Sequence, residues 1–220
     1  MSDRQDEATG YARAPNEAES ASAAHRCVRA ASPPGGDAAI DWYRLAGRLA
    51  RLGPALWLHR DVGDAAFPRA RLAQRGVLLL DHPALTALSS CVALHARAAI
   101  GSHGPREWLE LIDARGTCSA RLCLLPDTDY LAWDAMLAEC AIARARVPVP
   151  VPEPWRAHAA FMRCALRRKG ITWHAQVVRF PLLQLPCLRV LGLRAPVELS
   201  VLGGQVAATI ARDENVTLRG

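Results

Sequence analysis

Hydrophobic residues recur along the chain at two spacings, which together predict a mixed α+β protein. Over residues 38–52 apolar side chains fall three to four positions apart with arginines between them, as is typical of an amphipathic helix. Short apolar or alternating runs at 55–60, 76–80, 91–100 and 106–113 predict β-strands instead. Helices and strands do not alternate regularly, so we expect antiparallel sheet with helices packed on it.

The middle of the chain predicts a β-hairpin followed by a helix. Residues 113–116 (DARG) are typical of a tight turn in which glycine supplies the positive φ, and 117–125 reads as the returning strand. Asp127 and Asp129 precede a helix predicted over 130–145, because aspartate caps helix N-termini well. The residues expected on its inner face are Leu131, Met136, Leu137 and Cys140.

Composition divides the chain into a tail and two folded units. Residues 1–37 are rich in Ala, Ser, Glu, Pro and Gly, which predicts a disordered tail. The proline-alternating stretch 146–154 predicts an extended linker. A first α+β unit is therefore expected over 38–145 and a partial second α+β unit over 155–220.

The partial second unit is expected to hold a helix followed by a hairpin. The helix is predicted over 155–170, where Gly170 ends it. Beyond it, residues 196–202 and 205–211 are expected to be two strands, with the tight turn at Gly203–Gly204 between them.

Length and charge narrow the functional classes. The 220 residues contain no charge-free apolar run of about 18 residues, so no membrane span is predicted. The acidic, polar N-terminus lacks the pattern of a signal peptide, and we expect a cytoplasmic protein with reduced cysteines. The net charge of +6 suits an anionic ligand, nucleic acid or anionic lipid, or reflects an arginine-rich surface without a ligand. Nucleic acid is not favoured, since no aromatic-interleaved RNA-binding motif occurs.

Catalytic signatures are absent from the sequence: there is no GxSxG, HExxH, P-loop or strand-linked GxGxxG. The seven histidines are scattered along the chain, and a lone histidine is more often a structural or surface residue than a ligand. No catalytic residue is therefore assigned.

Residues 111–140 resemble the bacterial HemS/HmuS haem-utilisation family and, less closely, its ChuX/HutX relatives. Two apolar residues precede an Asp-x-x-Gly turn at Asp113–Gly116, a strand with basic Arg121 follows, and Thr128–Asp129 leads into an Ala-Trp-x-Ala helix. Residues 53–61, with Arg60, are similar to a family strand. Residues 155–172 are similar to the start of its second half.

The resemblance implies a pseudo-repeated α+β fold with an incomplete second half, in which haem is the cofactor. It implies His158 as the axial ligand of the haem iron, because imidazole suits that role, with His174 held in reserve. Arg121 and Arg60 would pair the haem propionates, since guanidinium binds carboxylates in bidentate fashion. Haem and components of a haem-uptake transporter are the implied partners, and haem degradation is left open as an activity.

The chain also departs from the family pattern. The family's Asp-Leu-Arg ahead of the hairpin is replaced by residues 83–90 (PALTALSS), and the Arg after the second-half Thr is Trp173. We therefore hold two main hypotheses: a cytosolic haem-binding or haem-trafficking protein, and a degenerate relative without haem that acts as an interaction or structural protein. A pocket closed by Trp57, Trp108 and Trp173 would favour the second.

Overall fold

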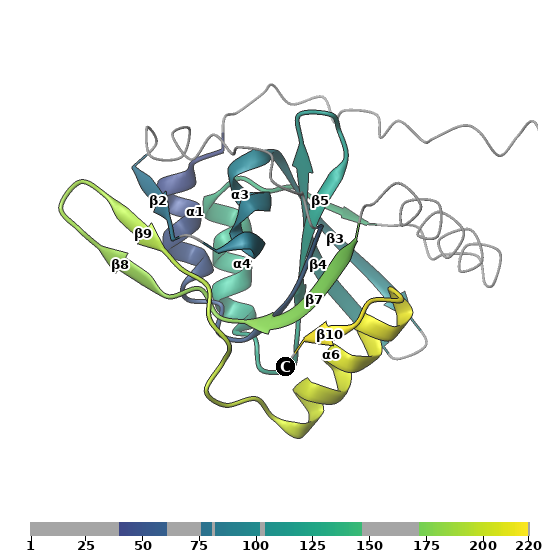
Figure 1. Ribbon diagram of the computed structural model, residues 1–220. Coiled ribbons are helices and arrows are strands. Elements are labelled where there is room, and N and C mark those ends of the chain that lie inside the picture. The colour runs from purple at the N-terminus through teal and green to yellow at the C-terminus, as the bar shows by residue number, and fades with distance from the viewer. Residues whose placement is uncertain (1–39, 61–75, 81, 102–103, 147–171, 220) are drawn as a thin grey trace, which may run out of the picture. The chain divides into compact units, whose positions relative to one another are not determined.

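The computed structural model describes residues 40–60, 76–80, 82–101, 104–146 and 172–219 (Figure 1). Their mixture of helices and mainly antiparallel strands confirms the α+β class. The predicted tail, the linker beyond Arg146 and the helix predicted over 155–170 lie outside the described residues.

A seven-stranded sheet in the order β10-β7-β1-β5-β4-β3-β6 forms the centre of the fold. Antiparallel pairing joins β7 through β3, whereas the short β10 and β6 add in parallel at the two edges. The strands are β1 (Ala55–Arg60), β3 (Cys91–Gly101), β4 (Gly104–Asp113), β5 (Cys118–Leu124), β6 (Arg144–Arg146), β7 (Trp173–Val178) and β10 (Leu218–Arg219). Since β7 pairs with β1, the predicted units 38–145 and 155–220 both contribute strands to this one sheet.

Helices cover one face of this sheet (Figure 1). They are α1 (Trp42–Leu49), α3 (Thr86–Ser90), which follows the 3₁₀ turn η2 (Pro83–Leu85), and α4 (Tyr130–Glu139). Trp57 of β1 is fully buried beneath them, and its indole Nε1 donates to the Ala84 carbonyl at 2.9 Å. The helix-side core is therefore closed around a hydrogen-bonded tryptophan.

A second, three-stranded sheet in the order β2-β9-β8 lies beside α1 (Figure 1). Its strands are β2 (Val77–Leu79), β8 (Leu182–Gln184) and β9 (Arg189–Leu191). The Arg189 guanidinium lies 3.8 Å above the Tyr43 ring and donates to the Tyr43 carbonyl, which ties β9 to α1.

The hairpin predicted at residues 113–116 is confirmed. The Asp113 carboxylate accepts from the backbone N–H groups of Arg115 and Thr117 at 2.9 Å each. Gly116 adopts φ +72°, a value that disfavours other residues. The turn is thus fixed by its own sequence.

The strand pair predicted at 196–202 and 205–211 is wrong. Residues Val201–Asp213 form helix α6, and the two glycines lie within it. Ser200 caps the helix by accepting from the Gly203 N–H, and the Asp127 carboxylate accepts from both the N–H and the hydroxyl of Ser200 at 2.8 Å. Gly203 is needed there because it has no side chain to displace Asp127.

The helix predicted over 130–145 is too long. α4 ends at Glu139, Ala141 takes φ +52°, and the chain continues into β6. Met136 and Leu137 face inward as expected, but Leu131 is 82% exposed. The Asp129 cap sets the helix phase so that Trp133 faces inward and Leu131 faces solvent.

Candidate functional site

The two faces of the main sheet have different neighbours, and β1 separates them. Trp57 packs with the core under α1, α3 and α4, whereas Leu56 and Leu58 pack against Ala207 and Ile210 of α6. Because side chains alternate along a strand, His59 shares the helix-side face with Trp57, and Arg60 shares the α6-side face with Leu58. The α6-side face carries the predicted arginines.

Arg121 lies near the middle of β5 on the α6-side face, opposite Leu58. Its Nε lies 3.4 Å from Glu110 Oε1, and its Nη1 lies 3.2 Å from Glu214 Oε1, just beyond α6. Burial by itself lowers the pKa of this guanidinium, but the two carboxylates and neighbouring thiols outweigh burial and raise the pKa. Arg121 is therefore a permanent cation that already has two acidic partners.

Glu110 connects Arg121 to a wider polar cluster on β3 and β4. Its carboxylate accepts from the Arg97 guanidinium at 3.3 Å and from the Trp108 indole N–H at 3.1 Å. His95 of β3 is paired in register with Glu110, which in turn is paired with Arg121, so all three side chains share one row across the sheet. Adjacent strands are about 4.8 Å apart, so the backbone positions of His95 and Arg121 are separated by about 10 Å along this row.

Arg60 lies at the end of β1 on the same face as Arg121. Its guanidinium is 5.9 Å from the centre of the Trp173 ring on β7. The Cys118 thiol is close enough to both arginines that their charges lower its pKa, although burial is the larger effect and raises it to about 11. The two arginines predicted for propionates therefore lie on one face, beside a protonated thiol.

The two predicted histidine ligands have different outcomes. His158 lies outside the described residues. His174 of β7 is paired with His59 of β1, and their ring centroids are 5.5 Å apart. That pair faces the helix side, so the sheet lies between His174 and the two arginines. His95, which our sequence reasoning did not single out, is the described histidine in the row of Arg121.

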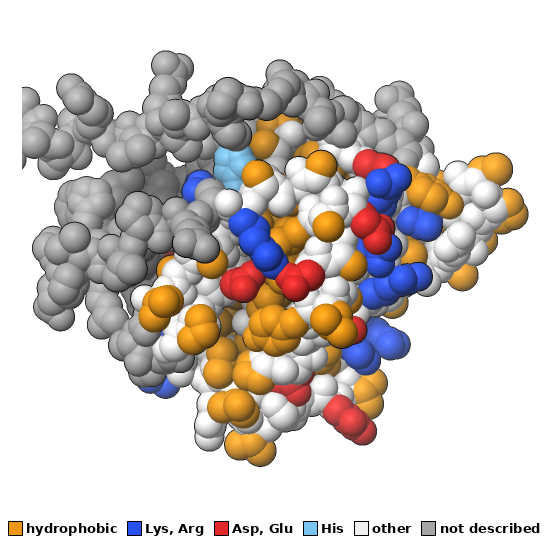
Figure 2. Space-filling view, turned by 180° about the vertical axis from the view of Figure 1, so that it is seen from behind, with side chains coloured by type: hydrophobic (Ala, Val, Ile, Leu, Met, Phe, Trp, Pro, Cys, Tyr) orange, Lys and Arg blue, Asp and Glu red, His pale blue; other side chains and the backbone are white. Residues whose placement is uncertain are grey.

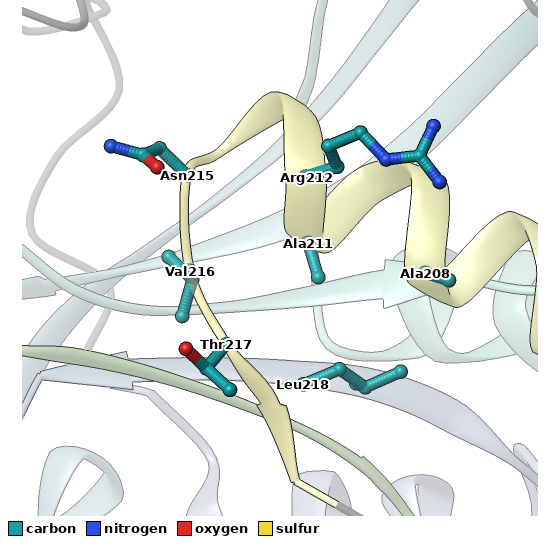
Figure 3. Close-up of a pocket in the computed structure, with 7 residues that line it drawn as sticks. All are labelled: Ala208, Ala211, Arg212, Asn215, Val216, Thr217 and Leu218. Atoms are coloured by element: carbon teal, nitrogen blue, oxygen red, sulfur yellow. The ribbon is translucent and has the colours of Figure 1, made fainter.

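One shallow pocket of about 430 Å³ lies between α6 and β10. It is lined by Ala208, Ala211, Arg212, Asn215, Val216, Thr217 and Leu218. Figure 3 shows Arg212 and Asn215 pointing away from each other, so the pocket lacks the converging polar groups that are usual in a ligand site. None of the predicted site residues lines it.

Charges on the face shown in Figure 2 are mixed in sign. Basic and acidic side chains lie next to one another there, and hydrophobic side chains are exposed among them. Within the ranges that the structure describes, no group of three or more His, Cys, Asp or Glu side chains could hold a metal ion. No helix in those ranges has the length and apolar character that a membrane crossing requires.

Trp57, Trp108 and Trp173, expected to close the pocket in the haem-free hypothesis, differ in burial. Trp57 is 1% exposed, whereas Trp108 and Trp173 are half-buried beside the α6-side core. Trp57 thus fills space in the core on the helix side of the sheet, whereas the aromatic rings of Trp108 and Trp173 are partly exposed on the α6-side face. Comparison with protein-family models and with curated proteins finds no match to this chain.

Proposed function

We propose that this protein binds and carries haem in the cytoplasm during bacterial haem-iron utilisation. The observation that supports this most is the placement of Arg60 and Arg121 on one sheet face, with His95 in the same cross-strand row as Arg121. Two guanidinium groups suit two propionates, and imidazole suits haem iron. The half-buried rings of Trp108 and Trp173 add apolar surface on the same face.

The axial ligand in this proposal is His158, as the family resemblance implies, and His95 is the candidate that the described face adds. His174 is the weaker choice, because it faces the opposite side of the sheet from both arginines. A haem bound on the α6-side face would therefore need His158 or His95 for its iron.

Glu214 sets a cost for haem binding in this arrangement. It occupies one side of the Arg121 guanidinium, and a propionate would have to replace it or share the arginine. Glu110, the other partner, also accepts from Arg97 and Trp108. We therefore expect Glu214→Gln to tighten haem binding, whereas Arg121→Met should weaken it.

A hemin titration followed by the Soret band tests the proposal. We expect saturable binding by the full chain, loss of the shifted band in either His158→Ala or His95→Ala, and an unchanged band in His82→Asn. His82 is the matched control because it caps η2 on the helix side and the asparagine keeps an acceptor there. A flat titration, or a band unchanged in both ligand variants, would contradict haem binding on this face.

A second function, as an interaction or structural protein without haem, is favoured by the ion pairs of Arg121. A guanidinium already held by Glu110 and Glu214 stabilises the docking of α6 without any ligand. In that case the full chain gives no Soret shift, and Arg121→Met lowers thermal stability without changing any hemin response.

A further inference from the structure

The hairpin of β8 and β9 presents a strand edge that no described residue pairs with. β8 is the last strand of the small sheet, and Figure 1 shows the hairpin extending away from the main sheet. Unpaired strand edges carry free N–H and C=O groups that can pair with another strand.

The backbone hydrogen bonds of this hairpin show which groups on β8 point toward the open edge. Leu185 and Leu188 exchange backbone hydrogen bonds, and the Gly192 N–H donates to the Pro181 carbonyl. Because inward and outward residues alternate in an antiparallel ladder, 181, 183 and 185 bond toward β9. The N–H and C=O groups of Leu182 and Gln184 therefore point away from the sheet.

The outward face of the small sheet is apolar. Leu78 of β2, Val190 of β9 and Leu183 of β8 are paired in register and form one row. Leu78 is 39% exposed and Leu183 is 59% exposed, whereas Leu191 on the opposite face is buried in the core. This apolar row reaches the free edge at Leu183.

The two edge strands of the main sheet contain charged side chains, which β8 lacks. β6 contains two arginines, and β10 ends with Arg219. Charged residues are a usual means of preventing edge pairing. Residues 181–188 contain no charged side chain, so the β8 edge fits an uncharged strand.

We propose that β8 pairs with β8 of a second copy of this chain, antiparallel and centred on Leu183. In that register Leu182 of each copy faces Gln184 of the other, and all the outward N–H and C=O groups are used in four hydrogen bonds. A shift centred on Gln184 would bring in Pro186, which has no N–H. The two apolar rows then join into one across the interface, which makes the edge complementary to itself.

Sedimentation equilibrium of the full chain tests the dimer. We expect the wild type to dimerise and Leu183→Lys to weaken dimerisation by at least about tenfold, because two like charges would face each other directly. Val197→Lys is the matched control, since Val197 is 83% exposed and lies outside the hairpin. Far-UV circular dichroism checks that both variants are folded.

Crosslinking gives a second, positive test. Leu183→Cys, in a chain lacking Cys27, Cys164 and Cys187, should form a disulfide dimer on mild oxidation, because directly opposed Cβ atoms lie about 4.5–5.5 Å apart, near the disulfide range. Val197→Cys in the same background should not. A wild type that is monomeric at every concentration, a dimer that persists in Leu183→Lys, or equal crosslinking of the two cysteine variants would overturn the proposal.

Discussion

Gly203 and Gly204 are neighbours in the first turns of α6, yet alanine should affect stability in opposite directions at the two positions. A Cβ at Gly203 would overlap Asp127 Oδ2 and would lie 3.0 Å from Asp127 Cγ and from the movable end of the Leu199 side chain. A Cβ at Gly204 meets only Leu199, at 3.9 Å, which is an ordinary contact. Both alanines remove the flexibility of glycine from the unfolded chain, but only the first displaces a capping carboxylate.

The magnitudes follow from the contacts of Asp127. Moving this side chain gives up its two hydrogen bonds to Ser200, worth about 2 kcal/mol together because the acceptor is charged. Against this loss, alanine stabilises a helix by about 1 kcal/mol relative to glycine. Gly203→Ala should therefore destabilise the protein by about 1 kcal/mol, and Gly204→Ala should stabilise it by about 0.5–1 kcal/mol.

Urea unfolding of each variant, read by circular dichroism, measures these changes, and a thermal scan should show shifts of about 2–4 °C in opposite directions. Asp127→Ala supplies the control: in that background Gly203→Ala should become stabilising, because the overlap with the carboxylate is gone and the remaining close atom is the end of the flexible Leu199 side chain. Equal effects of the two alanines, or a destabilising Gly203→Ala without Asp127, would refute this account of the α6 cap.

Three further outcomes are expected. Burial raises the pKa of Cys91 and Cys123 from 9.0 to about 12, so the unfolded chain loses these thiol protons at lower pH than the folded chain does. The free energy of unfolding should therefore be unaffected below pH about 9 and fall by up to about 1.4 kcal/mol per pH unit per thiol as the pH rises toward 12. Urea unfolding at pH 8 and at pH 10 measures this difference. A thiol reagent should modify exposed Cys187 in the folded protein but reach Cys91 and Cys123 only after unfolding, and equal labelling rates would contradict their burial. Trp57→Phe should cost about 2 kcal/mol in thermal unfolding, because it leaves a small cavity and an unpaired Ala84 carbonyl, and a neutral effect would contradict the closed core.

Local chemistry explains which parts of the fold the sequence could predict. The turn at 113–116 is specified by an aspartate that binds its own backbone and by a glycine at positive φ, so it could be read without tertiary information. α6 was missed because Gly203–Gly204 is also a strong turn signal. The carboxylate that makes glycine necessary there, Asp127, lies 76 positions earlier in the sequence.

The candidate site was less predictable, because strand order decides it. Alternation within a strand shows which residues share a face, as with Leu58 and Arg60. No local signal places β7 beside β1, and that pairing puts His174 opposite His59, on the far side of the sheet from both arginines. For the same reason, the sequence alone could not show that His95 lies beside Glu110, because the register of β3 and β4 decides that pairing.

The position of β1 between β5 and β7 has a consequence for biosynthesis. β1 is buried almost throughout, but one of its two neighbours is a strand more than 100 residues further along the chain. A nascent chain can form the hairpin of β4 and β5 early, yet the edge of β1 stays open until β7 has left the ribosome. The side chains of Leu56 and Leu58 stay uncovered until α6 follows. Polypeptides that stop before β7 should therefore aggregate through the edge of β1, and this one strand makes completion of the fold depend on a segment translated more than 100 residues later.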